Sequence, residues 1–221
     1  MNYLDNFSKL IHKKKNLLKC IFTTLLCQLL ITSLIFTLIY KSRKQNNEFR
    51  LLYSLLFLFL GILLIMFMTM YQLTFKQRLV FFTLFSVLQG VFLGFSLQYF
   101  GATAIMSALL FTCLLFSTML IFGFFLVYFQ IDLSWLGIFL FFLLLTLIIL
   151  RIVSFFSPFS KTRDKLLTVF ALLLFSVYII YDTNNILLRY DSIKYERDCI
   201  LGALDYYLDI INIFVNSIGT E

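Results

Sequence analysis

The amino-acid sequence predicts an all-α integral membrane protein, folded as a seven-transmembrane-helix bundle. Three observations support this class: 62% of the 221 residues are hydrophobic, only 13% are charged, and the apolar residues form long uninterrupted runs. Soluble domains are about 45–50% apolar and about 25% charged. A soluble chain of this length could not bury so much apolar surface, and a disordered chain could not keep it solvated. The composition therefore excludes both classes.

Six apolar runs are long enough to cross a bilayer, which takes about 20 residues in a helix. A seventh run, Cys199–Ile218, carries several polar groups, and the sequence leaves open whether it spans the membrane or re-enters it. Membrane β-strands are not expected, because such strands alternate polar and apolar residues. The six clear runs are Cys20–Tyr40, Leu51–Tyr71, Leu79–Tyr99, Ile105–Tyr128, Trp135–Phe156 and Leu166–Leu188.

Aromatic residues and small residues support individual runs. Tyr40, Tyr71 and other aromatic residues fall at run ends, where an amphipathic ring lies at the level of the lipid headgroups. In the third run, Ser86, Gly90 and Gly94 are spaced four residues apart, which predicts close packing against another helix. The first run is too long for a signal peptide, lacks a small-residue cleavage site and is followed by further spans.

The domain organisation follows from these runs. We expect a short basic cytosolic tail at residues 1–19, a single transmembrane bundle domain at 20–218 and a C-terminal end at 219–221. Basic residues beside a first span favour the cytoplasmic side, although the later loops support this orientation only narrowly. The alternative role of the tail is contact with anionic lipid. Its lysines are Lys9, Lys13, Lys14, Lys15 and Lys19.

Polar residues of the sixth run follow the helical repeat. Tyr178, Asp182, Asn185 and Arg189 are spaced i, i+4, i+7 and i+11, so they share one face of a helix. Ionisable groups inside a membrane are costly and usually face a bundle interior or a wet cavity. This face is therefore a candidate functional surface.

The seventh run repeats the same spacing with Asp205, Asp209, Asn212 and Asn216. Two successive helices thus each carry one polar stripe, and turning the stripes towards each other would shield both from lipid. Paired carboxylates in a low dielectric share a proton and titrate as a unit. The pattern predicts a pH sensor, a proton relay or an oxygen site for calcium, whereas the plainer alternative is that the aspartates only cap backbone groups.

Other residues give weaker predictions. Arg151 is expected to extend towards the membrane interface, with a salt bridge to Asp182 as the alternative. All four cysteines are expected to be buried, inert thiols. His12 has no metal-binding or catalytic neighbour in the sequence, and no nucleophile–base pair or zinc-type cluster is present. We therefore do not expect an enzyme. The basic residues lie between apolar runs rather than on one face, so no nucleic-acid partner is expected either.

Two segments resemble the paired signature of the Bax inhibitor-1 family, also called transmembrane Bax inhibitor motif proteins, and most closely its Lifeguard branch. They are Ile179–Thr183, with the sequence IIYDT, and Tyr207–Phe214, with the sequence YLDIINIF. The resemblance extends from about Lys19 to Gly219. It implies a compact seven-helix bundle with a central last helix, in which Asp182 and Asp209 form a hydrogen-bonded, pH-sensing pair.

The resemblance also implies a pH-sensitive calcium leak and suppression of cell death. It places eukaryotic members in the endoplasmic reticulum or Golgi; a viral chain would share this location, and a bacterial one would lie in the inner membrane. Two departures bear on the site. Ser86 stands where many members have Glu, which removes an acidic group, and Asp205 adds a carboxylate where the family usually has a neutral residue.

The polar stripes and the family resemblance together predict a calcium leak channel that is gated by Asp182 and Asp209. Asp205, Asn185, Asn212 and Tyr178 are auxiliary cavity residues, and the three aspartates are candidate calcium ligands. The alternatives are a non-conducting regulator of other membrane proteins and a proton-coupled cation exchanger. The expected partners are membrane lipid, calcium ions and protons, with membrane-protein partners unidentified. No cofactor is expected beyond calcium itself.

Overall fold

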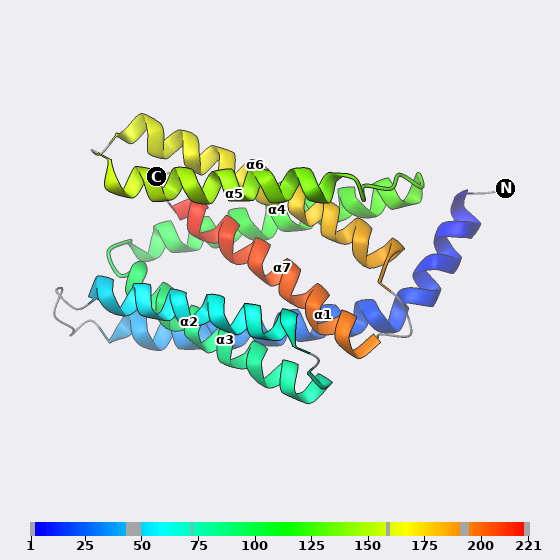
Figure 1. The fold of residues 1–221 in the computed structure, drawn as a ribbon, viewed down its shortest axis with the longest axis horizontal. Coiled ribbons are helices and arrows are strands. Elements are labelled where there is room, and N and C mark those ends of the chain that lie inside the picture. Colours follow the sequence, from blue (N-terminus) through cyan, green and yellow to red (C-terminus); the bar gives the residue numbers. More distant parts are fainter. Residues whose placement is uncertain (1–2, 43–49, 72, 158–159, 191–194, 219–221) are drawn as a thin grey trace. The chain divides into compact units, whose positions relative to one another are not determined.

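The computed structural model describes residues 3–42, 50–71, 73–157, 160–190 and 195–218. These residues form seven helices and no strand (Figure 1). Six of the helices are long and apolar enough to cross a membrane, and α2 contributes the apolar segment Phe59–Met70. The prediction of an all-α, multi-pass membrane protein is confirmed. The helices are α1 (Tyr3–Lys41), α2 (Arg50–Met70), α3 (Phe75–Ser96), α4 (Ala102–Tyr128), α5 (Leu136–Phe156), α6 (Lys161–Leu188) and α7 (Tyr195–Ile218).

Helix α1 begins far before the apolar run that predicted it. The predicted basic tail is helical from Tyr3 onward, and α1 reaches 39 residues. At about 1.5 Å per residue this is roughly 58 Å, twice the hydrocarbon thickness of about 30 Å. The sequence allows this because no Gly or Pro lies between Tyr3 and Lys41. The predicted C-terminal end, residues 219–221, lies outside the described residues.

The chain divides into two compact units. The α4–α6 unit comprises Met1–Lys15, Ala102–Ser192 and Leu208–Glu221, and the α1–α3 unit comprises Asn16–Gly101 and Ile193–Tyr207. Within the first, α4 and α5 both pack against α6; within the second, α2 packs against α3 (Figure 1). Helices α1 and α7 contribute residues to both units.

The centre of the α1–α3 unit is a cluster of neutral polar groups, which we call the Thr32 cluster. Thr32 shares a hydrogen bond of 2.6 Å with the Tyr207 hydroxyl and donates to the Ser86 carbonyl oxygen at 3.1 Å. Gln28 donates to the Thr83 hydroxyl at 3.1 Å. The Tyr207 side chain is fully buried. Because these hydrogen bonds run between helices, the cluster holds α1, α3 and the first part of α7 together.

Small residues let α3 approach α1 closely. A Cβ atom on Gly90 would lie 2.8 Å from both the Ile35 Cβ and the Thr32 carbonyl oxygen, and one on Gly94 would lie 2.6 Å from the Ile39 Cβ. Ser86 is fully buried on the same face. The predicted small-residue packing surface is confirmed.

The prediction of four inert thiols is wrong for one pair. Cys20 on α1 and Cys199 on α7 form a disulfide within the α1–α3 unit, with their Cα atoms 5.8 Å apart. Disulfides need Cα atoms about 4.4–6.8 Å apart, which only the packing of the two helices provides. Cys27 and Cys113 are free, as predicted, but they lie exposed on the helix surfaces rather than buried.

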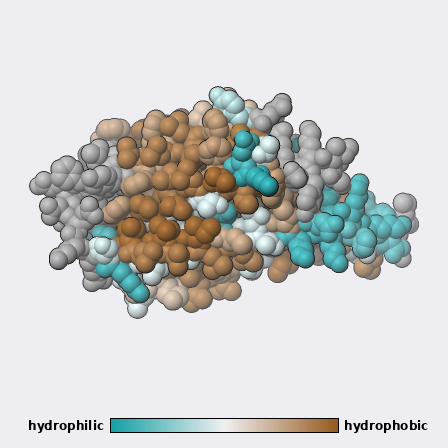
Figure 2. Space-filling view, turned by 90° about the horizontal axis from the view of Figure 1, so that it is seen from below, coloured by the Kyte–Doolittle hydropathy of each residue, from teal (hydrophilic) through white to brown (hydrophobic). Residues whose placement is uncertain are grey.

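Much of the remaining helix surface is apolar and exposed. In the most apolar part of α5 only 11% of the residues are buried, and side chains such as Ile138, Phe141 and Ile152 are more than half exposed. Apolar side chains dominate the helix surfaces seen in Figure 2. In a membrane protein such surfaces face lipid, so they need no protein partner.

Candidate functional site in the α4–α6 unit

Helix α6 carries the first of the two predicted polar stripes. Tyr178, Asp182 and Asn185 are half-buried, while Ile179 and Ile186 on the adjoining face are fully buried. The Asn185 Oδ1 atom is buried and accepts no hydrogen bond from any described residue. An amide oxygen of this kind is an available ligand for a cation.

The second part of α7 carries the other stripe. Asp209 is only 4% exposed, and Asn212 and Asn216 are half-buried. Asn212 Nδ2 donates to the Leu208 carbonyl oxygen and Asn216 Nδ2 to the Asn212 carbonyl oxygen, each at 2.8 Å. Because both amides turn their nitrogens to their own helix, their oxygens are left to accept hydrogen bonds from elsewhere.

The two stripes meet at Tyr178. The Tyr178 hydroxyl lies within electrostatic range of both Asp182, on its own helix, and Asp209, on α7. We call Tyr178, Asp182, Asn185 and Asp209 the Tyr178 cluster. It places a phenol within electrostatic range of two carboxylates, with the Asn185 amide on the same face of α6, all within membrane-spanning segments. Ionisable groups in such segments usually have a function.

The predicted calcium site of three aspartates is not found. Among the described residues, no group of three or more His, Cys, Asp or Glu side chains could hold a metal ion. The helical repeat puts Asp205 and Asp209 on one face of α7, but that spacing alone does not assemble a three-carboxylate site. The roles of Asp182 and Asp209 as a gate stay predictions.

Contacts from α4 and from the α4–α5 connection fix α6 beside the cluster. A Cβ on Gly123 of α4 would lie 2.7 Å from the Thr183 Cβ, so the two helices are in close contact there. Asn184 donates to the Ile131 carbonyl oxygen at 2.7 Å and accepts from the Leu133 backbone N–H at 3.1 Å. Sequence reasoning missed Asn184, for which the neighbouring stripe residue Asn185 was the only signal.

Arg151 has neutral partners. Its Nη2 donates to Asn216 Oδ1 on α7 at 2.7 Å and to Thr168 Oγ1 on α6 at 3.3 Å. The alternative salt bridge to Asp182 is not what the structure shows, because the guanidinium lies where α5 ends and α6 begins, at the other end of α6 from Asp182. Asn216, predicted only as a stripe residue, is thus the acceptor for an intramembrane cation.

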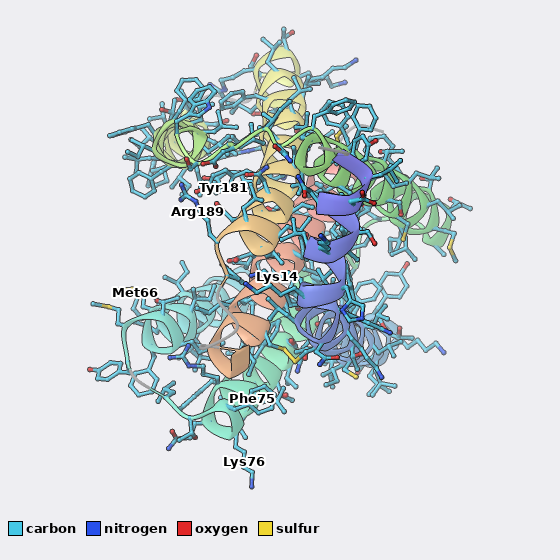
Figure 3. All side chains as sticks on the ribbon, turned by 90° about the vertical axis from the view of Figure 1, so that its right-hand side faces the viewer. Lys14, Met66, Phe75, Lys76, Tyr181 and Arg189 are labelled. Atoms are coloured by element: carbon cyan, nitrogen blue, oxygen red, sulfur yellow. A yellow bond between two sulfur atoms is a disulfide. The ribbon has the colours of Figure 1, made fainter. Side chains whose placement is uncertain are left out.

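The first residues of α1 contact the α4–α6 unit near the end of α6. Lys14 is buried and donates to the Tyr190 carbonyl oxygen, just beyond Arg189 (Figure 3). A cation is favoured at a helix C-terminus, where unsatisfied carbonyl oxygens carry partial negative charge. Arg189 itself is exposed, so the predicted α6 stripe leaves the interior at its last residue.

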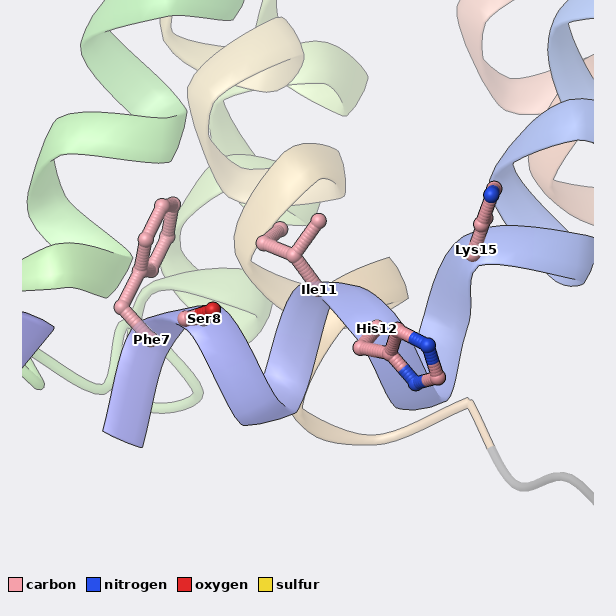
Figure 4. A pocket seen from close by; sticks show the side chains of 5 residues that line it. All are labelled: Phe7, Ser8, Ile11, His12 and Lys15. Atoms are coloured by element: carbon pink, nitrogen blue, oxygen red, sulfur yellow. The ribbon is translucent and has the colours of Figure 1, made fainter. Parts of the chain in front are cut away.

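A shallow pocket of about 400 Å³ lies along the beginning of α1 (Figure 4). It is lined by Phe7, Ser8, Ile11, His12 and Lys15. It contains none of the predicted site residues. All of its lining residues belong to one helix, α1, so it is a depression in the surface. The pocket therefore adds nothing to the Tyr178 cluster.

The fold and the site define the class as a multi-pass helical membrane protein with an acidic cluster inside its spans. Comparison with known proteins is more specific, because a family model described as "inhibitor of apoptosis-promoting Bax1" matches residues 14–217. The chain belongs to this family, which confirms the predicted resemblance.

Individual relatives agree with the family match. Bax inhibitor 1 of Schizosaccharomyces pombe is 30% identical over 200 residues, covering 90% of this chain and 73% of the relative. Protein LIFEGUARD 4 of Arabidopsis thaliana is 28% identical over 132 residues, covering 60% of this chain and 52% of the relative. Protein LIFEGUARD 1 of the same plant is 33% identical over 88 residues, or 40% of this chain and 36% of the relative.

Proposed function

We propose that the protein is a calcium leak channel whose conductance rises with pH. The observation that carries the proposal is the position of Tyr178 within electrostatic range of both Asp182 and Asp209, inside membrane-spanning helices. We infer from this shared neighbour that the two acids interact, and interacting acids titrate as a coupled pair. The proposal therefore assigns the gate to the pair rather than to either residue alone.

The gate acts through charge. When the pair shares a proton, its groups hydrogen-bond and the net negative charge is small. When both acids are ionised, they repel each other and attract cations, which favours an open path. The Asn185 oxygen, buried and without a described donor, supplies a further neutral ligand to a passing cation.

The proposal is tested by measuring calcium flux into liposomes that contain the purified protein, at pH values from about 5 to 8, because interacting carboxylates in a low dielectric titrate as a coupled pair. We expect wild-type flux to rise with pH and Asp182→Asn/Asp209→Asn flux to lose that dependence. Asp132→Asn is the matched control. Asp132 is an exposed acid of the same unit, and its carboxylate accepts hydrogen bonds from Ser134. Absence of wild-type flux at every pH, with folding confirmed, would overturn the proposal.

A second proposed function is the suppression of cell death, exerted by regulating other membrane proteins from an endoplasmic-reticulum or Golgi-type membrane. It is favoured by the family's description and by the name of the fission-yeast relative. Survival of yeast cells expressing Bax, with and without this protein, tests it. Equal protection by wild type and by Asp182→Asn/Asp209→Asn would separate this function from calcium conductance.

We also propose that the N-terminus faces the cytoplasm, because α1 begins with exposed lysines such as Lys9, Lys13 and Lys15. Microscopy of the protein fused to a fluorescent protein identifies the cellular membrane in which it resides. Protease protection of an N-terminal tag determines its side: cleavage from the cytoplasmic side is expected, and full protection would reverse the orientation.

A further inference from the structure

Arg151 is a charged residue within the spans that the proposed gate does not use. It lies in the span Leu136–Ser154 of α5 and is half-buried. An arginine there is costly, and unlike an acid it cannot relieve the cost by losing its charge at physiological pH. A purely structural hydrogen bond to Asn216 could have been made by a neutral donor. The permanent charge therefore calls for an explanation.

Its position relative to α7 connects it with the Tyr178 cluster. Asn216, the acceptor for Arg151 at 2.7 Å, follows Asp209 by about two helical turns on the same polar face of α7, roughly 10 Å along the axis. A cation that moves along this face from Asp209 therefore approaches the guanidinium next. One polar face thus carries an attracting group and, further on, a repelling one.

Nearby acids do not cancel the charge of Arg151. Asp164, on the first turn of α6, lies within electrostatic range of Arg151. Asp164 also pairs with Arg163, at 3.8 Å between Nε and Oδ1, and accepts a hydrogen bond from Ser154 at 2.8 Å. Among the described residues, Arg151 and Arg163 share one acid, Asp164, so this group of three side chains keeps a net positive charge.

We propose that Arg151 is a selectivity-determining residue, a fixed positive charge that disfavours divalent over monovalent cations along the polar face of α7. The proposal rests on the calcium leak proposed above and deepens it, because it names the residue that limits that leak. Coulomb energy is proportional to the charge of the permeating ion. The electrostatic barrier that Arg151 presents to Ca²⁺ is therefore twice the barrier that it presents to K⁺. Because rates depend exponentially on barriers, the factor by which the charge slows Ca²⁺ is the square of the factor by which it slows K⁺.

The different effects expected on K⁺ and Ca²⁺ flux distinguish an electrostatic role of Arg151 from a structural one. If Arg151→Gln raises K⁺ flux about threefold, it should raise Ca²⁺ flux about ninefold, because the energies scale with charge. Gln can still donate a hydrogen bond to Asn216, so mainly the charge is lost. A merely loosened bundle would raise both fluxes by the same factor.

The experiment compares K⁺ and Ca²⁺ fluxes in liposomes containing wild type, Arg151→Gln, Arg151→Lys or Arg163→Gln. Arg151→Lys keeps the charge and should keep the wild-type flux ratio. Arg163→Gln is the matched control, since Arg163 is a neighbouring arginine paired with Asp164 and about one-third exposed; its effect on the ratio should be smaller. An unchanged ratio in folded Arg151→Gln would overturn the proposal, as would equal increases for both ions.

Asn216→Asp provides a second variant in case Arg151→Gln fails to fold. A carboxylate at this position pairs with Arg151 and neutralises it in place, so the Ca²⁺/K⁺ flux ratio should rise; an unchanged ratio counts against the barrier. Failure of the two proposals is distinguishable. Absence of flux in every variant overturns both, whereas pH-dependent wild-type flux with an unchanged ratio in the variants overturns the Arg151 barrier alone.

Discussion

The Thr32 cluster and the Tyr178 cluster bury polar groups in different ways. In the Thr32 cluster every group is neutral, and Thr32, Tyr207 and Gln28 each have a hydrogen-bond partner on another helix, although the buried Gln28 Oε1 atom has no described donor. In the Tyr178 cluster two of the groups are acids, and the buried Asn185 oxygen has no described donor. Each cluster thus contains one buried amide oxygen without a described donor, and the two clusters differ in charge. Hydrogen-bonded neutral groups stabilise a packing interface, whereas buried charges cost stability. The hydrogen bonds of the Thr32 cluster hold helices together, and the buried acids of the Tyr178 cluster support its proposed role as the gate.

The largest expected effect on stability comes from the disulfide that supports the Thr32 cluster. Cys20→Ser should lower the free energy of unfolding by about 2–4 kcal/mol, because the bond between α1 and α7 restricts the unfolded chain. Thermal unfolding without reductant measures the loss, and Cys27→Ser, a free exposed cysteine on α1, is the control. Maleimide labelling of the denatured, unreduced protein should modify two cysteines; labelling of all four would contradict the pairing.

The next effect comes from close helix packing beside Thr32. Gly90→Ala should cost about 1–3 kcal/mol, because the added Cβ meets a backbone oxygen that cannot move without shifting α1. Gly61→Ala is the matched control, since its nearest neighbour is the edge of the Phe85 ring at 3.2 Å. Equal unfolding temperatures for the two variants would show that α1 and α3 do not depend on this contact.

A smaller loss is expected for Tyr207→Phe. The change removes the 2.6 Å hydrogen bond to Thr32 but keeps the ring, which packs edge-on against Phe82 and Phe85 at 5.4 and 5.7 Å. A loss of about 0.5–1.5 kcal/mol follows, since a buried acceptor loses its partner. Ion flux should keep its pH dependence, and a change in that dependence would mean that the Thr32 cluster takes part in gating.

Asn185→Leu should have the smallest effect on stability. Its oxygen is already buried without a described donor, so an apolar side chain of similar size removes a cost, and unfolding should change by less than about 1 kcal/mol. Calcium flux should fall because a neutral ligand is lost. If the variant is destabilised as much as Tyr207→Phe, Asn185 belongs to the structural polar groups instead.

The sequence predicted the helices and the two polar stripes because both follow local periodicity. The runs of apolar residues placed every helix, and the spacing of Asp182 and Asp209 identified the residues that now lie around Tyr178. Helix lengths were less accurate. The polar character of the first 19 residues predicts a tail, although they contain no Gly or Pro that would interrupt a helix.

Pairings between helices could not be predicted from local spacing. The Cys20–Cys199 disulfide joins residues 179 positions apart. The acceptor for Arg151 of α5 lies on α7, and the whole of α6 separates these two helices in the sequence. These features depend on packing, which a single sequence does not display.

The most direct test of the account compares the pH dependence of calcium flux after changes in the two clusters. Liposomes containing Asp182→Asn/Asp209→Asn should lose the rise in flux between about pH 5 and 8, whereas those containing Tyr207→Phe should retain it at wild-type slope. Loss of the rise in both variants, or its persistence in the double aspartate variant, would contradict the assignment of the gate to the Tyr178 cluster.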